Sequence, residues 1–376
     1  MVQIALKRID WLLVAFIIPI ILAGLFTMKS FGVANGGSSF FGKQIIWIIL
    51  SFAVFFSFSF IDFRFLKRTN ILVFIFLGFC TILLALFVLG KVSHGAQSWF
   101  DFGGFSFQPA DMMKLVLVIV LAKYFSRRHV EIRNFKHIFI SGFYALIPFT
   151  LILLQPDFGG AMIIFFIWIG MVFVSGISKT HLLLVFTSTA VIFATLWFFA
   201  FAPYQKDRIS NFLNPLADIH DSGYNVYQST IAVGSGQLLG KGLGFGTQSR
   251  LQFLPEPQAD FIFAAFAEEW GFVGSTLIIL LYGFVIWRIL YSASLGATNF
   301  EMLFGMGIAI YFMSHILINI GMNLGIFPVT GIPLPFMSYG GSHLLTEFAG
   351  LGILMSMRRY ERPAHRDDMK NEFFGV

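Results

Sequence analysis

Two groups of ionisable residues are candidates for chemistry because each lies at the edge of a long apolar run. In the first, QPADMMK at 108–114, Asp111 and Lys114 are three residues apart at the start of a predicted helix. That spacing places both side chains on one helix face, where they can pair. Two interpretations stay open: a membrane-embedded ion pair, or an acidic helix start followed by a lysine that snorkels to the interface.

The second group is acidic and lies in LPEPQADFIFAAFAEEWG at 254–271, where four carboxylates fall within fourteen residues: Glu256, Asp260, Glu268 and Glu269. Such a cluster could bind a divalent cation, or keep a proton on one member through like-charge proximity. The alternative is a solvated loop end followed by a helix whose two glutamates bond to neighbouring helices.

The glycine-rich segment GSGQLLGKGLGFG at 234–246 does not fit a P-loop, because no strand or βαβ unit surrounds it. Its backbone N–H groups, with Lys241, Arg208 and Arg250, could still cradle a pyrophosphate. The alternative is a flexible loop rich in turns.

Further polar residues occur in apolar surroundings near the C-terminal end. His315 and His343 lack metal-ligand spacing and are interpreted as buried histidines. Asn319 and Asn323 are predicted to hold helices together.

The elements that must position these residues are membrane-spanning helices. The chain of 376 residues is 57% hydrophobic and 12% charged, whereas soluble domains carry about 25% charged residues. A single cysteine, Cys80, excludes an internal disulfide. The net charge of +6 reflects the placement of basic residues around a membrane and gives no indication of nucleic-acid binding.

Stretches of roughly 20 apolar residues predict about ten transmembrane helices and an all-α integral membrane fold. The predicted spans are 10–28, 44–61, 70–90, 110–126, 137–154, 159–177, 180–202, 261–290, 300–327 and 342–357. With the N-terminus inside, 16 of the 25 Lys and Arg residues fall in cytoplasmic segments. The positive-inside rule therefore predicts that both termini are cytoplasmic.

The predicted organisation is one polytopic membrane domain, 1–360, followed by a charged cytoplasmic tail, 361–376. The long outer loop 203–260, between the seventh and eighth spans, is expected to be folded because apolar and aromatic residues recur along it. Two more outer segments, 91–109 and 328–341, are expected to converge with it on the site. The second contains GIPLPFMSYGG, which cannot form a regular helix and so must be buried in protein or line a cavity.

Four segments in this order resemble the SEDS family (shape, elongation, division and sporulation), and the resemblance spans about residues 9–358. They are GAQSWFDFGGFSFQPADMMK at 95–114, QPDFGGA at 155–161, the stretch from GYNVYQST to EEWGFVG at 223–274, and GIFPVTGIPLPFMSYGGS at 325–342. The residues of these motifs are more similar to those of the elongation branch of the family than to those of its division branch.

The resemblance implies a ten-helix SEDS-type fold and a peptidoglycan glycosyltransferase that polymerises lipid II for cell elongation and rod shape. It also implies a class B penicillin-binding protein as transpeptidase partner, other elongation machinery, and residence in the bacterial cytoplasmic membrane. The family's essential acidic residue corresponds to Asp260, and its acid–lysine pair to Asp111 and Lys114. Residues expected to bind substrate or shape the site are Asp111, Lys114, Glu256, Trp99, Gln108, Lys241, Arg208, Arg250 and Ser338.

This chain departs from the family pattern at two places. QPAD stands where the family usually has QPSE, so Asp111 replaces a glutamate. Ser98 stands where the family usually has an arginine before the tryptophan, here Trp99. The second departure removes one expected cation from the outer site.

The predicted reaction is an inverting glycosyl transfer in which Asp260 acts as the base or orients the acceptor, and cationic groups stabilise the pyrophosphate leaving group. A divalent cation, Mg²⁺ or Mn²⁺, is an expected aid, and no organic cofactor is expected. Two alternatives are a lipid II flippase, which needs polar groups through the full depth of the membrane, and a non-catalytic scaffold. The position of the carboxylates in the outer half favours an enzyme.

Overall fold

The computed structural model describes residues 9–31, 37–93, 96–101, 106–127, 135–176 and 222–358, with isolated positions between 183 and 212. The seventh predicted span, 180–202, lies mostly outside the described residues. So do Arg208, most of the loop segment 203–221 and the tail 361–376.

The other nine predicted spans each coincide with a helix. The helices are α2 (Trp11–Ser30), α3 (Gly37–Phe60), α4 (Thr69–Leu89), α5 (Pro109–Ser126), α6 (Phe135–Leu154), α7 (Phe158–Val174), α12 (Ile262–Ser294), α13 (Asn299–Asn323) and α14 (Gly341–Arg358). A short 3₁₀ helix, η2 (Phe63–Lys67), joins α3 to α4.

Six of the described helices, α2, α3, α4, α6, α12 and α13, are long and apolar enough to cross a bilayer. The protein is therefore a multi-pass membrane protein. In α14, 16 of 18 residues are buried, and in α5, 13 of 18. Because neighbouring helices shield these two from lipid, they can carry ionisable side chains that would be costly on a lipid-facing helix.

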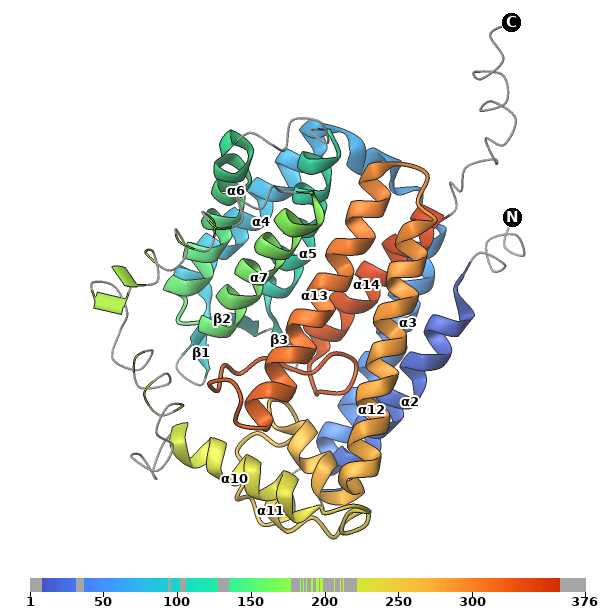
Figure 1. Cartoon of the computed structure of the whole chain (residues 1–376), viewed down its shortest axis with the longest axis vertical. Coiled ribbons are helices and arrows are strands. Elements are labelled where there is room, and N and C mark those ends of the chain that lie inside the picture. The colour runs from blue at the N-terminus through green and yellow to red at the C-terminus, as the bar shows by residue number, and fades with distance from the viewer. Residues whose placement is uncertain are drawn as a thin grey trace, which may run out of the picture.

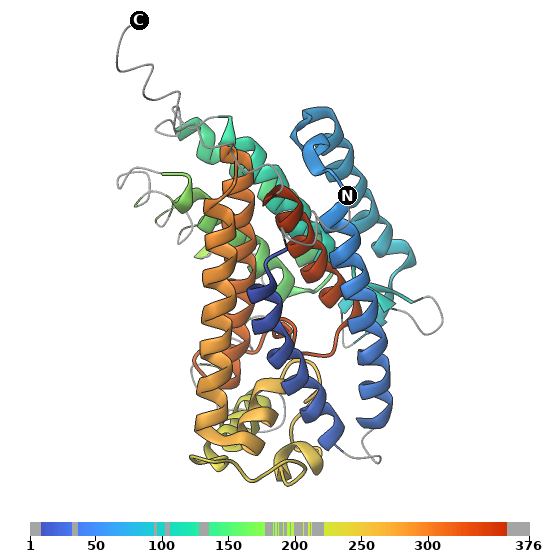
Figure 2. The same cartoon turned by 90° about the vertical axis from the view of Figure 1, so that its right-hand side faces the viewer.

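The helices form an elongated bundle (Figures 1 and 2). In both views α2 begins, and α14 ends, toward one end of this bundle. Two further helices, α10 (Ser222–Ser235) and α11 (Thr247–Arg250), lie at the opposite end. The segment before α12 is therefore folded over its described part, 222–260, as expected.

A small antiparallel sheet precedes α5, in the segment predicted as a polar and aromatic outer loop. Its strands are β1 (Lys91–Ser93), β2 (Ala96–Asp101) and β3 (Ser106–Phe107), in the order β1-β2-β3. Lys91 pairs with Trp99, and Phe100 with Phe107. The sheet packs against α4 and α5 and so brings Ser98 and Trp99 next to the helices.

The eighth predicted span, a continuous helix over 261–290, is wrong in its first part. The backbone of Gly271 leaves the helical region, with φ 67° and ψ −164°, and divides α12 into a short segment and a long spanning helix. A Cβ at Gly271 would lie 2.3 Å from the amide nitrogen of Gly240, so only glycine fits this turn. Glu268 and Glu269 therefore lie on the short segment and not on the spanning helix.

Candidate functional site

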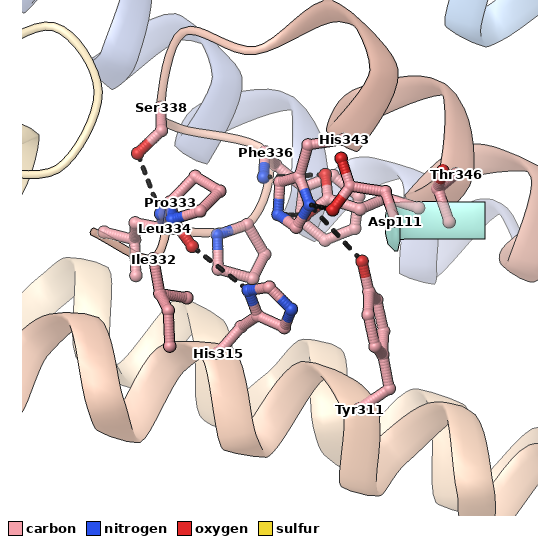
Figure 3. Close-up of polar contacts among 12 residues, drawn as sticks. Asp111, Tyr311, His315, Ile332, Pro333, Leu334, Phe336, Ser338, His343 and Thr346 are labelled. Carbon is pink, nitrogen blue, oxygen red and sulfur yellow. Dashed lines mark hydrogen bonds and ion pairs between the residues drawn. The ribbon is translucent and has the colours of Figure 1, made fainter. Parts of the chain in front are cut away.

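The segment between α13 and α14 is irregular, and side chains of spanning helices satisfy its backbone. Asn319 Nδ2 donates to the carbonyl oxygen of Ile332 at 2.7 Å. Tyr282 donates its hydroxyl to the carbonyl oxygen of Pro335 at 2.6 Å. His315 Nδ1 lies 3.3 Å from the carbonyl oxygen of Pro333 (Figure 3). These contacts confirm the expectation that this segment is buried in protein, because unpaired backbone groups at membrane depth are costly.

Asp260 lies directly before the short segment of α12, with its main chain held by α13. Its carbonyl oxygen accepts hydrogen bonds from Asn319 Nδ2 and Asn323 Nδ2, each at 3.0 Å. The two asparagines thus hold helices together, as predicted, and also position the candidate base. A Cβ at Gly331, which has φ 69°, would lie 3.5 Å from Asp260 Oδ2, so the glycine turn passes beside the carboxylate.

Ser338 connects the same irregular segment to the residues before Asp260. Its hydroxyl donates to the carbonyl oxygen of Ala259 at 2.6 Å and accepts from the Leu334 amide at 2.8 Å. The Tyr339 amide donates to the carbonyl oxygen of Gln258 at 2.8 Å. Partial burial raises the pKa of the Tyr339 phenol.

Asp111 and Lys114 form a buried ion pair. Lys114 Nζ lies 2.9 Å from Asp111 Oδ1, and the two side chains are 4% and 3% exposed. The other carboxylate oxygen, Oδ2, accepts from the Ser342 hydroxyl at 3.1 Å. The interpretation of Lys114 as a snorkelling lysine is therefore wrong, and the embedded pair is confirmed.

His343 on α14 lies beside this pair and in turn contacts Glu347 on the same helix, and neither residue was predicted as part of the site. His343 Nδ1 lies 3.6 Å from Asp111 Oδ1, and His343 Nε2 lies 2.8 Å from Glu347 Oε1. Tyr311 presents its hydroxyl 3.4 Å from His343 Nδ1. Figure 3 shows Asp111, Tyr311 and His343 facing one another beside the irregular segment. The spacing of four residues between His343 and Glu347 is the one signal in the sequence that could have indicated their contact with each other.

The motif QPDFGGA at 155–161, at the start of α7, contacts both the small sheet and the start of α5. Gln108 Nε2 donates to Asp157 Oδ2 at 3.1 Å, which joins the start of α5 to the start of α7. Ser98 is 1% exposed, and its hydroxyl lies 3.4 Å from the carbonyl oxygen of Gln155. Trp99, the next residue, is half-buried on β2. Ser98 therefore faces the helices and not the solvent.

The four carboxylates of 256–269 do not share one cluster of contacts. Glu268 is fully buried and accepts from the backbone amides of Thr247 and Gln248 at 2.8 Å and 3.1 Å. Lys241 Nζ pairs with the same carboxylate at 2.7 Å. Glu269 accepts from the amide of Gly244 at 3.1 Å. Both glutamates therefore hold the glycine-rich segment in place, because the turn at Gly271 directs them toward it.

Two further predicted residues, Arg250 and Glu256, lie in the same segment before α12. Arg250 donates to the carbonyl oxygen of Gly244 at 3.3 Å. Glu256 is exposed and accepts from Gln258 Nε2 at 2.6 Å.

Within the residues that the structure describes, no three His, Cys, Asp or Glu side chains gather in a group that could hold a metal ion.

The fold is that of a polytopic membrane protein. Its spanning helices form a bundle with a folded segment at one end, and the acidic residue Asp260 lies where the two meet. Residues 5–363 match the FtsW/RodA/SpoVE family, described as "Cell cycle protein". The chain belongs to this family, which is the SEDS family.

Its known relatives carry consistent names. The chain is 39% identical over 284 residues to "Peptidoglycan glycosyltransferase MrdB" of Escherichia coli K12, covering 75% of this chain and 76% of that protein. It is 30% identical over 428 residues to "Peptidoglycan glycosyltransferase RodA" of Treponema pallidum, covering 93% and 97%. "Stage V sporulation protein E" of Bacillus subtilis is 37% identical over 333 residues, covering 86% and 88%.

Solved structures agree with these relatives. A chain in a peptidoglycan synthase complex, described as coordinating polymerization and crosslinking, has a TM-score of 0.80 at 29% identity, covering 93% of this chain and 97% of that one. The crystal structure of Thermus thermophilus RodA has a TM-score of 0.69 at 27% identity, covering 94% and 97%.

Proposed function

We propose that this protein is a peptidoglycan glycosyltransferase that polymerises lipid II into glycan strands at the outer face of the bacterial cytoplasmic membrane. The names of its relatives support the reaction. The observation that carries the proposal is the placement of Asp260, whose main chain is held by Asn319 and Asn323 while its carboxylate lies beside the Gly331 turn. A carboxylate on a backbone that is fixed in this way suits a base that must act on a sugar hydroxyl.

In the proposed reaction the 4-hydroxyl of one sugar attacks the anomeric carbon of another, which carries a lipid pyrophosphate. Asp260 takes the hydroxyl proton as the new glycosidic bond forms. The bond from the anomeric carbon to pyrophosphate breaks with inversion, and the lipid pyrophosphate leaves with its electron pair. No covalent enzyme intermediate is required.

Cations near the outer segment would stabilise the leaving group. Arg250 and Arg208 are the proposed pyrophosphate contacts, with Lys241, whose ammonium group is shared with Glu268. Lys114 is buried in its pair with Asp111 and supports the fold of the site in this proposal. A divalent cation, Mg²⁺ or Mn²⁺, would be held by Glu256 or Asp260 together with substrate phosphate oxygens, since Mg²⁺ commonly uses one or two carboxylates.

The proposed partner is a class B penicillin-binding protein, which would cross-link the strands within the elongation machinery. The similarity to a chain of a complex that coordinates polymerization and crosslinking supports this partner. Both termini are proposed to be cytoplasmic, which the basic-residue asymmetry supports.

The test is whether the purified protein, alone or with its partner, converts lipid II into glycan, with and without a metal chelator. A flippase would instead move lipid II across liposomes without forming polymer. Polymer formation is the expected result, and translocation without polymer would contradict the proposal. The names of the relatives do not favour a flippase.

A further inference from the structure

The segment beside Asp260 contains a strained residue that the proposed reaction does not use. Phe336 has φ 61°, in the left-handed region that bulky side chains rarely adopt. Such a conformation persists only where the surrounding structure imposes it, and strained positions of this kind gather at functional sites. The contacts that impose it are therefore informative.

Glu347 supplies the polar contact. Its Oε2 accepts a hydrogen bond from the Phe336 amide at 3.0 Å. The Phe336 ring is 1% exposed, with its centroid 5.1 Å from that of Phe312 and 5.6 Å from that of Phe348. A buried carboxylate and two aromatic rings thus hold one residue from both its backbone and its side chain.

Glu347 is itself held in place. It is 1% exposed, and its second oxygen, Oε1, lies 2.8 Å from His343 Nε2. His343 in turn adjoins Asp111 and Tyr311. A carboxylate buried in this way is costly without partners, and here both oxygens face a polar group.

Phe336 is two positions before Ser338, whose hydroxyl bonds to the segment that precedes Asp260. Ser338 donates to the carbonyl oxygen of Ala259 and accepts from Leu334, so its position depends on the backbone turn at Phe336. The contact of Glu347 with Phe336 and the contact of Ser338 with Ala259 thus lie two residues apart along the same turn.

We propose that Glu347 is a positioning residue for Asp260. It acts by holding the Phe336 amide, which maintains the turn through which Ser338 fixes residues 258–260. The proposal rests on the proposed function only for its kinetic readout, because the turn itself can be measured without substrate.

The test compares Glu347→Leu with Glu347→Gln. The glutamine keeps an oxygen that can accept from the Phe336 amide, whereas the leucine removes it. Glu347→Leu is expected to lower kcat for lipid II polymerisation about 10- to 100-fold with KM changed much less, since small misplacements of catalytic groups have effects of this size. Glu347→Gln is expected to retain most of kcat. Amide hydrogen exchange of 332–340 and 256–260 is expected to rise in the leucine variant alone.

Glu301→Leu is the matched control. Glu301 is a carboxylate 2% exposed on α13 that pairs with Lys67 in η2. This variant is expected to lower the thermal midpoint while keeping kcat. An equal loss of kcat in the control would overturn the proposal, because activity would then follow stability alone.

The remaining outcomes are also decisive. A folded Glu347→Leu protein with wild-type kcat or unchanged exchange at 332–340 would overturn the proposal. So would a glutamine variant as impaired as the leucine variant with exchange unchanged, because charge and not the hydrogen bond would then matter. Wild-type polymerisation by Asp260→Asn would contradict the proposed role of Asp260 instead, and the exchange measurement would still test the turn.

Discussion

Buried ionisable residues in this protein have partners from several helices, so only some of their contacts can be predicted from the sequence. Asp111 is an example. Its two oxygens face Lys114 on its own helix and Ser342 and His343 on α14. The contact with Lys114 was predictable, because it follows from helical spacing alone. The contacts with α14 were not, because residues more than 200 positions apart meet only through tertiary packing.

Removing either member of the pair is expected to be costly. Asp111→Ala should lower the free energy of unfolding by about 3–5 kcal/mol, since it leaves Lys114 as an unpaired buried charge. Lys114→Ala should cost less, because Asp111 keeps its contacts with Ser342 and His343. Exchanging the two residues should restore only part of it, because a lysine at 111 would face His343 and lose the Ser342 contact. Thermal unfolding in detergent measures both effects. Single variants as stable as wild type would show that the pair contributes nothing.

Ser98 gives a second prediction at this scale. The family's usual arginine could be thought acceptable at this position, but Ser98 is 1% exposed against the Gln155 carbonyl. Ser98→Arg is therefore expected to reduce the yield of folded protein, because it buries a charge without a partner. Ser98→Ala, the control, should accumulate normally. Measuring folded protein by size-exclusion chromatography distinguishes them, and a well-folded, active arginine variant would contradict the packing described here.

At the scale of elements, the membrane spans could be predicted from the sequence, whereas the break within α12 could not. Hydropathy identifies apolar stretches, and nine of the ten predicted ranges coincide with described helices. Residues 261–267 are apolar and run without a Pro into the helix that follows, so hydropathy extends the predicted span across the turn at Gly271. The same turn explains why four carboxylates that are close in sequence separate in space. Two face the glycine-rich segment, and Asp260 lies beside Gly331.

The turn at Gly271 can be tested with a neighbouring glycine as control. Gly271→Ala is expected to lower stability, because φ 67° is unfavourable for alanine by about 1–2 kcal/mol and its Cβ would meet Gly240. Gly283→Ala, on the same helix with open space around the added Cβ, should be neutral or stabilising. Thermal midpoints of the two variants provide the comparison. Equal midpoints would show that Gly271 tolerates a side chain and that the turn does not depend on glycine.

At the scale of the whole molecule, apolar helices surround three largely buried helices, α5, α13 and α14, which carry most of the polar groups of the site. This placement lets α5 and α14 hold charged residues within the bundle, and it leaves the acidic candidate Asp260 where the outer segment meets the helices. Composition predicted the membrane class, but it could not reveal which helices are central, because burial depends on packing.

The proposed orientation can be tested directly. With Cys80 replaced, cysteines introduced at Asp218 and Arg133 should react with a membrane-impermeant reagent from opposite sides, because basic residues concentrate in the segments assigned to the inside. Labelling of both positions from the same side would contradict the ten-span topology.

The central claim is that Asp260 is the base of a glycosyl transfer, and the rate of glycan formation from purified lipid II tests it most directly. Asp260→Asn keeps the shape of the side chain but removes its charge and basicity, so the rate should fall about 10²–10⁴-fold while the protein remains folded. Asp62→Asn, at an exposed carboxylate that caps η2, is the matched control and should polymerise normally. Polymerisation by folded Asp260→Asn at the wild-type rate would contradict the account.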